Sequence, residues 1–272
     1  VATTETRGKG GARAEFLLAQ ISDTHVRTDD GGATLDRLRR VLHQVREYRC
    51  DAIVMTGDLA NNAQPEEFAL LSALLADAPA PVFLVPGNHD DRDPIRDCFP
   101  GHAYLPRSGA LSYAVDEFPV RLVVVDQIVP GETHGAFSAE NSDWLKATLD
   151  AAPDKPTIVA LHHPPFATHD MLFDNIGLHG ADEFVAALEG RRQVIRVICG
   201  HHHRSAVGQA AHAPVICAPS TAWGYAFAAS DDPPPSPAPS GIRSSITRAT
   251  RPGRSNASRK APAARTARLS RA

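Results

Sequence analysis

Residues 16–25 read FLLAQISDTH, an apolar run that ends at Ile21 and is followed at once by polar side chains, including Asp23 and His25. Short runs rich in Val, Ile and Leu are typical of strands buried inside a sheet. The same arrangement recurs along the chain, each time as an apolar run followed directly by side chains of types that can bind metals. Because ligands bind beyond the carboxyl ends of strands in open α/β sheets, we expect these segments to meet in one site.

The recurrences lie in four further segments, which share this position after an apolar run. They read Thr56-Gly-Asp58, Pro86-Gly-Asn-His-Asp90, Leu161-His-His-Pro-Pro165 and Gly200-His-His-His203. Glycines at 57, 87 and 200 permit tight turns that bring the backbone close to bound ions.

Spacing within the clusters favours shared ions. Side chains two residues apart on an extended segment project to the same side. Asp23 and His25 are therefore expected to reach one ion, and His201 and His203 to reach a common centre. Imidazole, carboxylate and amide oxygen together favour Zn, Mn or Fe over Ca, which takes oxygen ligands.

None of these segments is decisive alone. An isolated Asp-x-His is usually surface chemistry, since charged residues are mostly exposed, and an isolated Gly-Asp is usually a turn. Three consecutive histidines resemble an affinity tag, but this run is internal and follows the apolar run Val194–Cys199. All five clusters in order, each at a predicted strand end, favour a metal site.

The chain from residue 16 onward alternates predicted strands and helices, which implies crossover connections and a largely parallel sheet. Buried strands are predicted at Phe16–Ile21, Ala52–Thr56, Val82–Val85, Val120–Val125, Thr157–Leu161 and Val194–Cys199. Helices are predicted near residues 35–45, 65–75, 139–149 and 181–189, where apolar residues recur at helical spacing or an N-cap precedes the segment. Hairpins are expected between Leu111–Val115 and Val120–Val125, and between Ala206–Val207 and Pro214–Cys217.

The ordered set Asp-x-His, Gly-Asp, Gly-Asn-His-Asp, His and Gly-His-x-His resembles the signature of the calcineurin-like metallophosphoesterases, over about residues 20–220. The His-His-Pro-Pro form at 162–165 is similar to that of bacterial class III cyclic-nucleotide phosphodiesterases and the related glycerophosphodiesterases. The resemblance implies an α/β fold, a four-layer α/β/β/α sandwich with a dinuclear metal site at the strand ends.

The resemblance also implies roles for particular residues. Two divalent ions (Fe, Mn or Zn) would be held by seven side chains. Asp23, His25 and His203 would hold the first ion, Asn88, His162 and His201 the second, and Asp58 would bridge both. His162 is expected as the ligand of its pair, with His163 supporting it. His89 would be catalytic, either protonating the leaving oxygen or hydrogen-bonding the phosphoryl group.

The implied activity is hydrolysis of a small phosphodiester, such as 3′,5′-cAMP or a glycerophosphodiester, by attack of a metal-bridging hydroxide. Two divalent ions, two carboxylates and a hydroxide leave a net charge of +1, which suits a singly charged diester. One alternative is a phosphomonoesterase or nucleotidase on the same fold. The other is a non-catalytic interaction scaffold, which is disfavoured because all seven ligand positions are filled.

Composition narrows the class of partner. Residues 229–272 carry nine Lys/Arg and two Asp/Glu, a balance of +7, which leaves −10 on the other 228 residues of a chain whose net charge is −3. An acidic body disfavours a nucleic acid duplex as partner. With no apolar run long enough to span a membrane and no export signal, we expect a cytoplasmic protein. The four cysteines are expected as free thiols, and the oligomeric state is left open, a dimer included.

Three regions are expected: a flexible lead at residues 1–15, a catalytic domain at 16–228, and a disordered Pro/Ala/Arg/Ser-rich tail at 229–272. The tail has three large apolar residues, too few to offset the entropy of ordering. This ending departs from the family, whose members usually continue with further strands. One hypothesis is that a frameshift in a GC-rich gene produced it, which sequencing the gene again would test.

Overall fold

The computed structural model describes residues 15–225, 235–236 and 245–250. The expected lead at residues 1–15 lies almost entirely outside these ranges, and so does most of the expected tail. Among the helices within the described ranges, none combines the length and the apolar character that crossing a membrane requires.

The first sheet has the strand order β14-β1-β2-β3. Its strands are β1 (Glu15–Ile21), β2 (Ala52–Thr56), β3 (Val82–Val85) and β14 (Ser245–Thr250). The first three run parallel, because α1 (Ala33–Tyr48) and α2 (Pro65–Leu75) return the chain between them. Every residue of β2 and β3 is buried, which explains their continuous apolar sequence.

The second sheet has the order β10-β11-β9-β7-β5-β4. Its strands are β4 (Tyr113–Val115), β5 (Arg121–Val124), β7 (Thr157–Ala160), β9 (Val194–Cys199), β10 (Ala206–Ala210) and β11 (Ala213–Cys217). Strands β5, β7 and β9 are parallel and are joined through α4 (Ala139–Asp150) and α6 (Ala181–Leu188). The two expected hairpins are present as the antiparallel pairs β4–β5 and β10–β11.

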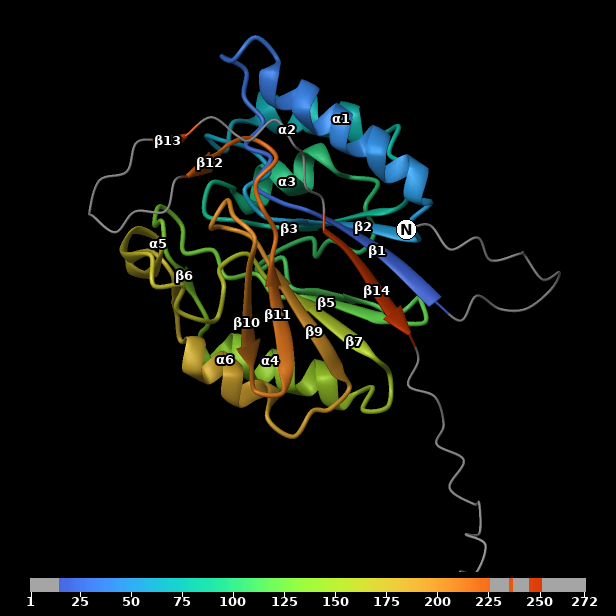
Figure 1. Ribbon diagram of the computed structural model, residues 1–272, viewed down its shortest axis with the longest axis vertical. Helices are drawn as coiled ribbons and strands as arrows, with labels where there is room; N and C mark the ends of the chain where they lie inside the picture. Colours follow the sequence, from blue (N-terminus) through green and yellow to red (C-terminus); the bar gives the residue numbers. More distant parts are fainter. Residues whose placement is uncertain (1–14, 226–234, 237–244, 251–272) are drawn as a thin grey trace, which may run out of the picture.

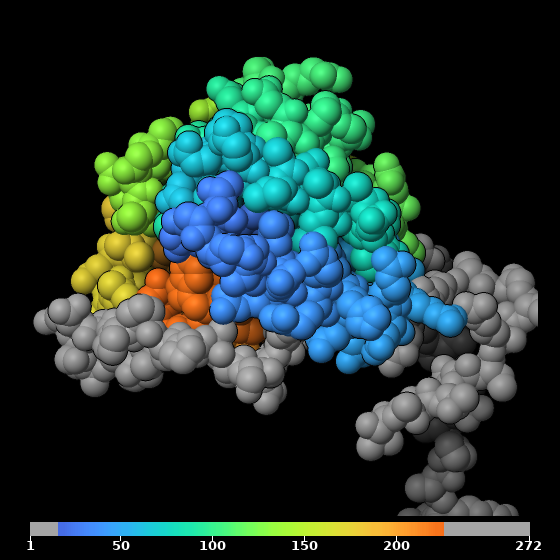
Figure 2. All heavy atoms as spheres, turned by 90° about the horizontal axis from the view of Figure 1, so that it is seen from above, coloured from blue at the N-terminus to red at the C-terminus, as the bar shows by residue number. Residues whose placement is uncertain are grey.

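Helices cover the outer faces of both sheets (Figure 1). Helices α1, α2 and α3 (Arg92–Cys98) lie over the first sheet, and α4 and α6 lie over the second. Seen from above, the blue to teal atoms of α1, α2 and α3 cover their side of the molecule (Figure 2).

Alternation along β5 shows how the layers are held together. Leu122 and Val124 belong to the apolar core that also contains the first sheet, whereas Val123 belongs to the core beneath α4 and α6. Successive side chains of a strand point to opposite faces, so one strand contributes to both cores. The observed order of layers, α/β/β/α, confirms the fold class that the sequence motifs predict.

Six short elements besides β14 were not predicted. They are the helices α3 and α5 (Met171–Asn175), the parallel pair β6 (Gly135–Ala136) and β8 (Leu178–His179), and the antiparallel pair β12 (Gly224–Tyr225) and β13 (Pro235–Ser236). Pieces of two to seven residues carry too little periodicity for a sequence pattern to identify them.

Strand β14 differs from the expectation of a disordered tail. It lies within residues 229–272 and pairs antiparallel with β1, from Glu15 opposite Thr250 to Gln20 opposite Ser245. The physical reason is that β1 would otherwise present unpaired backbone groups at the edge of the sheet, and backbone pairing does not require a large apolar side chain. For these six residues, and for residues 235–236 in β13, the structure has strands where disorder was expected; the other residues of the tail lie outside the described residues.

Candidate metal centre

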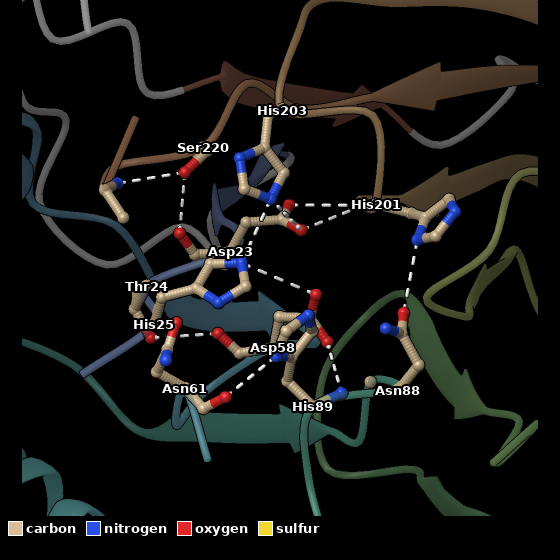
Figure 3. Close-up of polar contacts among 12 residues, drawn as sticks. Asp23, Thr24, His25, Asp58, Asn61, Asn88, His89, His201, His203 and Ser220 are labelled. Carbon is tan, nitrogen blue, oxygen red and sulfur yellow. Dashed lines mark hydrogen bonds and ion pairs between the residues drawn. The ribbon is translucent and has the colours of Figure 1, made fainter. Parts of the chain in front are cut away.

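All seven ligand candidates lie just beyond the carboxyl ends of strands. Asp23 and His25 follow β1, Asp58 follows β2 and Asn88 follows β3, all from the first sheet. The second sheet contributes the rest, with His162 after β7 and both His201 and His203 after β9. The structure therefore brings together side chains that are up to 180 residues apart in sequence, as Figure 3 shows for six of them.

The backbone at these positions is unusual. Positive φ angles occur at Asp23 (50°), His25 (40°), Asp58 (49°), His201 (72°) and His203 (55°). The left-handed region is uncommon for residues other than glycine, although Asp and His enter it more often than most. The expectation that Asp23 and His25 share a side of an extended segment is therefore wrong in its geometry: left-handed turns, rather than an extended strand, direct both side chains to the site.

The first cluster contains Asp23, His25 and His203. The Nε2 atoms of His25 and His203 are 3.0 Å apart, and His203 Nε2 is 3.4 Å from Asp23 Oδ1. Two ligand atoms bound to one ion at about 2.0–2.2 Å lie roughly 3.0–3.5 Å apart when the angle between them is near 90–110°. These spacings fit a single ion.

The second cluster contains Asn88, His162 and His201. Asn88 Oδ1 is 3.1 Å from His162 Nε2 and 3.2 Å from His201 Nδ1. The same metal–ligand geometry therefore fits one ion here as well, with two imidazole nitrogens and an amide oxygen as donors.

Asp58 lies between the two clusters (Figure 3). Its Oδ2 is 3.5 Å from His25 Nε2, and its Oδ1 is 3.3 Å from His162 Nε2. One carboxylate oxygen faces each cluster, which is the arrangement of a bridging ligand. The donor set and spacing therefore fit two ions that share Asp58.

Hydrogen bonds to backbone carbonyls orient two of the imidazoles. His162 Nδ1–H donates to the Thr56 carbonyl at 2.8 Å, and His203 Nδ1–H donates to the Trp223 carbonyl at 2.9 Å. Histidines that bind metals usually donate their second ring nitrogen in this way, which fixes the tautomer and leaves Nε2 free to coordinate.

Burial keeps three of the four candidate histidine ligands uncharged. Burial lowers the pKa of His25 and His201 well below the usual range and lowers the pKa of His203 to about 4. At neutral pH these three imidazoles are uncharged, which is the form that coordinates a metal.

His162 and Asp58 behave differently because they interact strongly. Burial alone would lower the pKa of His162, but the Asp58 carboxylate outweighs burial and raises that pKa to about 10. Burial alone would raise the pKa of Asp58, but the charge on His162 lowers it well below the usual range. In the metal-free protein the two side chains therefore form an ion pair.

At three of the motif positions glycine is required because a neighbouring side chain lies against the backbone. A Cβ at Gly57 would overlap the His162 ring, one at Gly87 would overlap Asp58, and one at Gly200 would overlap the Ser22 hydroxyl. At Gly57 the backbone is also left-handed, with φ of 92°. These glycines allow the loops from the two sheets to pack closely enough for their side chains to share ions.

His89 lies at the exposed side of the site. Its backbone N–H donates to Asp58 Oδ1 at 3.0 Å, and its Nδ1–H donates to the Asn61 carbonyl at 2.8 Å. The ring lies edge-on to His25, with 4.7 Å between ring centroids. These contacts hold the ring beside the first cluster and leave Nε2 available for a substrate.

Three residues at the site were not predicted. Asp90 is buried and accepts backbone hydrogen bonds from Leu59, Ala60 and Gly87 at 2.8–3.1 Å, which ties the loops after β2 and β3 together. Burial, followed by the nearby Asp58 carboxylate, raises the pKa of Asp90 to about 7. Its place in the Gly-Asn-His-Asp motif was a signal that could have identified it.

Trp223 and Tyr225 are the other two unpredicted residues. The Trp223 ring packs on His25 with 4.4 Å between centroids, and Figure 2 shows the orange segment before residue 226 beside the blue N-terminal part of the chain. Tyr225, in β12, packs on His203 at 5.1 Å. No metal motif includes these aromatic residues, so the sequence pattern gave no reason to select them.

Residues 16–205 match the family model described as calcineurin-like phosphoesterase. That range covers most of the chain and includes all seven ligand candidates, so fold and site together define a hydrolase of phosphoric ester bonds. The chain belongs to the calcineurin-like phosphoesterase family, as its motifs predicted.

Curated relatives have phosphodiesterase names. The chain is 33% identical to the glycerophosphodiester phosphodiesterase GpdQ of Enterobacter lignolyticus, over 76% of this chain and 77% of that protein. It is 32% identical to the cAMP/cGMP dual specificity phosphodiesterase MT0825 of Mycobacterium tuberculosis, over 78% of this chain and 69% of that protein. It is also 28% identical to the 3′,5′-cyclic adenosine monophosphate phosphodiesterase CpdA of Pseudomonas aeruginosa, over 80% of each.

Solved structures share the fold. A dimetal phosphatase from Danio rerio superposes with a TM-score of 0.64 at 18% identity, covering 76% of this chain and 88% of that one. At this identity the likeness concerns the fold alone.

Proposed function

We propose that this protein hydrolyses a small phosphodiester, either a cyclic nucleotide such as 3′,5′-cAMP or a glycerophosphodiester, with two divalent ions drawn from Fe, Mn and Zn. The observation that carries the proposal is the position of Asp58, whose two oxygens lie 3.5 and 3.3 Å from ligand candidates of separate clusters. The names of the curated relatives support the same class of substrate.

The proposed ligands divide as the two clusters do. Asp23, His25 and His203 hold one ion, and Asn88, His162 and His201 hold the other, with Asp58 shared. When bound, the two ions supply Lewis acidity, which makes hydroxide available near neutral pH and stabilises negative charge on the phosphoryl oxygens.

The charge of the site favours a monoanion. Asp23 and Asp58 are the two carboxylates among the proposed ligands, so two divalent ions leave the centre positive. A phosphodiester carries a single negative charge and is attracted to such a centre.

His89 acts on the leaving group in this proposal. Because Nδ1–H is held by the Asn61 carbonyl at 2.8 Å, the Nε2 of a protonated ring donates towards the substrate. Protonation of the departing alkoxide lowers the barrier where the alcohol is a poor leaving group, as in a ribose or glycerol ester.

A substrate panel tests the proposal. The purified chain, loaded with Mn²⁺, Zn²⁺ or Fe²⁺, would be assayed on 3′,5′-cAMP, glycerophosphocholine, bis-p-nitrophenyl phosphate and p-nitrophenyl phosphate. We expect kcat/KM for at least one natural diester to exceed that for the monoester by at least tenfold. Asp58→Asn provides the matched inactive control.

Preference for the monoester would replace the proposal with a phosphomonoesterase or nucleotidase. Turnover that stayed the same in Asp58→Asn would show that the metal centre described above is not the site of hydrolysis.

A further inference from the structure

Two buried ring nitrogens beside the second cluster have no hydrogen-bond partner among the described residues. They are Nε2 of His201 and Nδ1 of His163. The two side chains are almost fully buried, with 3% and 1% of their surface exposed. Their ring centroids are 4.3 Å apart and their planes are inclined by 42°. Two unsatisfied polar atoms this close together require a common explanation.

The protonation state of His201 follows from its role at the site. Its Nδ1 faces Asn88 Oδ1 at 3.2 Å, and Figure 3 shows the other ring nitrogen on the far side, away from Asn88. If Nδ1 coordinates the second ion, the neutral imidazole carries its proton on Nε2. That N–H is a buried donor and requires an acceptor.

The protonation state of His163 follows from its partner. His163 Nε2 lies 3.1 Å from the Thr133 carbonyl oxygen, which can only accept a hydrogen bond. The proton of the neutral ring is therefore on Nε2, and Nδ1 presents a lone pair. The two unpartnered atoms are thus complementary, one a donor and the other an acceptor.

The surroundings of His163 hold its ring in this position. Its backbone N–H donates to Gln127 Oε1 at 2.9 Å, which fixes the chain where β7 ends. A Cβ at Gly135 would lie 2.5 Å from His163 Nδ1, so only glycine at this position of β6 leaves room for the ring. Gly135 and Thr133 precede α4, and the loop that contains them thereby contributes to the metal centre without supplying a ligand.

We infer that His163 is a positioning residue for the second ion: one buried water accepts a hydrogen bond from His201 Nε2–H and donates one to His163 Nδ1. The resulting chain runs from His201 through the water and His163 to the Thr133 carbonyl. It fixes the tautomer of His201 and orients its Nδ1 towards Asn88, which raises the affinity of the site for a metal. The inference deepens the proposed function and rests on it.

A different role for His163 would use the same lone pair. Its ring nitrogen lies within 4.8 Å of ligand atoms of His162 and His201, so direct coordination of an ion is the competing assignment. A ligand and an acceptor respond differently to substitution and to spectroscopy, and the experiment is built on that difference.

The test measures metal affinity rather than turnover. The metal-free full-length protein would be titrated with Mn²⁺ by isothermal titration calorimetry, which resolves the two sites. His163→Asn places an amide oxygen near the position of Nδ1 and retains an acceptor for the water. His163→Gln places its amide near Nε2 and retains the bond to Thr133, but has no acceptor at the Nδ1 position.

We expect the second site to weaken by about 10–100-fold in His163→Gln and by less than fivefold in His163→Asn, with the first site unchanged in both. His212→Gln is the matched control, because the His212 ring also donates to a carbonyl, that of Val194, at the opposite end of β9 from the site. Equal losses in the Gln and Asn variants would reduce His163 to a packing role and overturn the inference.

Nitrogen NMR on the unmodified protein decides the question without any variant. With Cd²⁺ enriched in ¹¹³Cd at both sites, His163 should show a protonated Nε2, an unprotonated Nδ1 and no coupling to cadmium, while His201 should couple through Nδ1. Coupling of His163 to ¹¹³Cd, or a proton on its Nδ1, would overturn the inference. Absence of metal binding in the unmodified protein would instead contradict the proposed function itself.

Discussion

At the scale of single residues, the site depends on backbone conformations that are costly elsewhere. Five of the seven proposed ligands have positive φ. A non-glycine residue held there costs roughly 1–3 kcal/mol and persists only where the surrounding structure compensates. Here the compensation includes the backbone N–H of His201, which donates to both carboxylate oxygens of Asp23 at 3.1 and 3.2 Å. The strained turns of the two sheets therefore support one another.

Asp58 is the residue whose loss should affect both ions. Asp58→Ala removes one of two proposed carboxylate ligands and opens coordination at two centres, so we expect loss of activity and of bound metal, with poor recovery in excess metal. Elemental analysis with kinetics provides the measurement. A variant that kept two ions and near-normal turnover would contradict the bridging role.

Replacing His89 should affect catalysis without affecting metal binding. Because none of the proposed ligands is changed, His89→Ala should retain both ions while kcat falls by roughly 10²–10⁴-fold, the usual contribution of a positioned acid or base. The loss should be larger for a cyclic nucleotide, whose ribose oxygen needs a proton, than for bis-p-nitrophenyl phosphate, whose leaving group departs without one.

Comparing the two substrates distinguishes the possible roles of His89. Equal losses on both substrates would assign His89 to electrostatic stabilisation of the phosphoryl group. Loss of metal would assign it to bracing the loop after β3, since its backbone N–H donates to Asp58. His102, a half-buried histidine outside the site, provides the control substitution His102→Ala.

At the scale of elements, the sequence predicts what is local and periodic. The ends of β2, β3 and β9 agree with the predicted strands residue for residue, because buried parallel strands are continuous apolar runs with turns on both sides. The ligand candidates could be identified for the same reason, since each follows such a run. The left-handed turns could not be predicted, because alternation rules assume an extended chain.

Local sequence patterns do not show which distant segments of the chain pair with each other. Strand β14 joins β1 across more than 220 residues, and its sequence, SITRAT, contains the β-branched Ile246, Thr247 and Thr250. β-Branched residues favour strands, but nothing in the segment indicates which edge it pairs with. His163 was expected to support the ligands, but its closeness to His201 follows from the pairing of β7 with β9, which no local pattern shows.

The pairing of β14 leads to a stability prediction. Deleting residues 245–272 uncovers the edge of β1 and removes its backbone hydrogen bonds, each worth about 0.5–1.5 kcal/mol before the entropy of ordering is subtracted. A net loss of about 1–2 kcal/mol would lower Tm by roughly 2–8 °C. Metal content should be unchanged, because no proposed ligand lies in the deleted segment.

Differential scanning fluorimetry on two truncations measures the effect. Deletion of residues 251–272 removes only the chain beyond β14 and provides the matched control, for which we expect an unchanged Tm. The same Tm for both truncations would show that β14 does not stabilise the fold.

At the scale of the whole molecule, the candidate metal centre lies where the two sheets meet. Of the proposed ligands, the first sheet contributes Asp23, His25, Asp58 and Asn88, and the second contributes His162, His201 and His203. Each proposed ion takes ligands from both. Ions that bind only the folded arrangement stabilise it by mass action, so removing them should lower Tm, and adding them back should restore it in proportion to the logarithm of their concentration.

The stability of the metal-free protein should depend on pH, with a sign set by His162. Its pKa in the metal-free protein is about 10, because Asp58 outweighs burial, whereas an unfolded histidine titrates near 6.5. A pKa raised by folding contributes stability that is complete below about pH 6.5 and declines as the pH rises towards 10. The metal-free protein therefore loses this contribution across that window. Burial raises the pKa of Asp23 as well. This carboxyl group therefore also makes the folded protein less stable as the pH rises, in a window that begins at lower pH.

Metal loading has the opposite dependence, because His162 must give up its proton to coordinate. Each unit by which the pH rises should strengthen metal binding at the second site about tenfold, and binding of the ion should release at least one proton. The gap in Tm between loaded and metal-free protein should widen from pH 6.5 to 8.5. Calorimetry in two buffers of different ionisation enthalpy counts the protons released per ion bound, and Asp58→Asn, which removes the charge that holds the His162 proton, should release fewer for each ion that it still binds. A gap that stayed constant or narrowed, with no proton released, would show that His162 is already neutral before the ion binds.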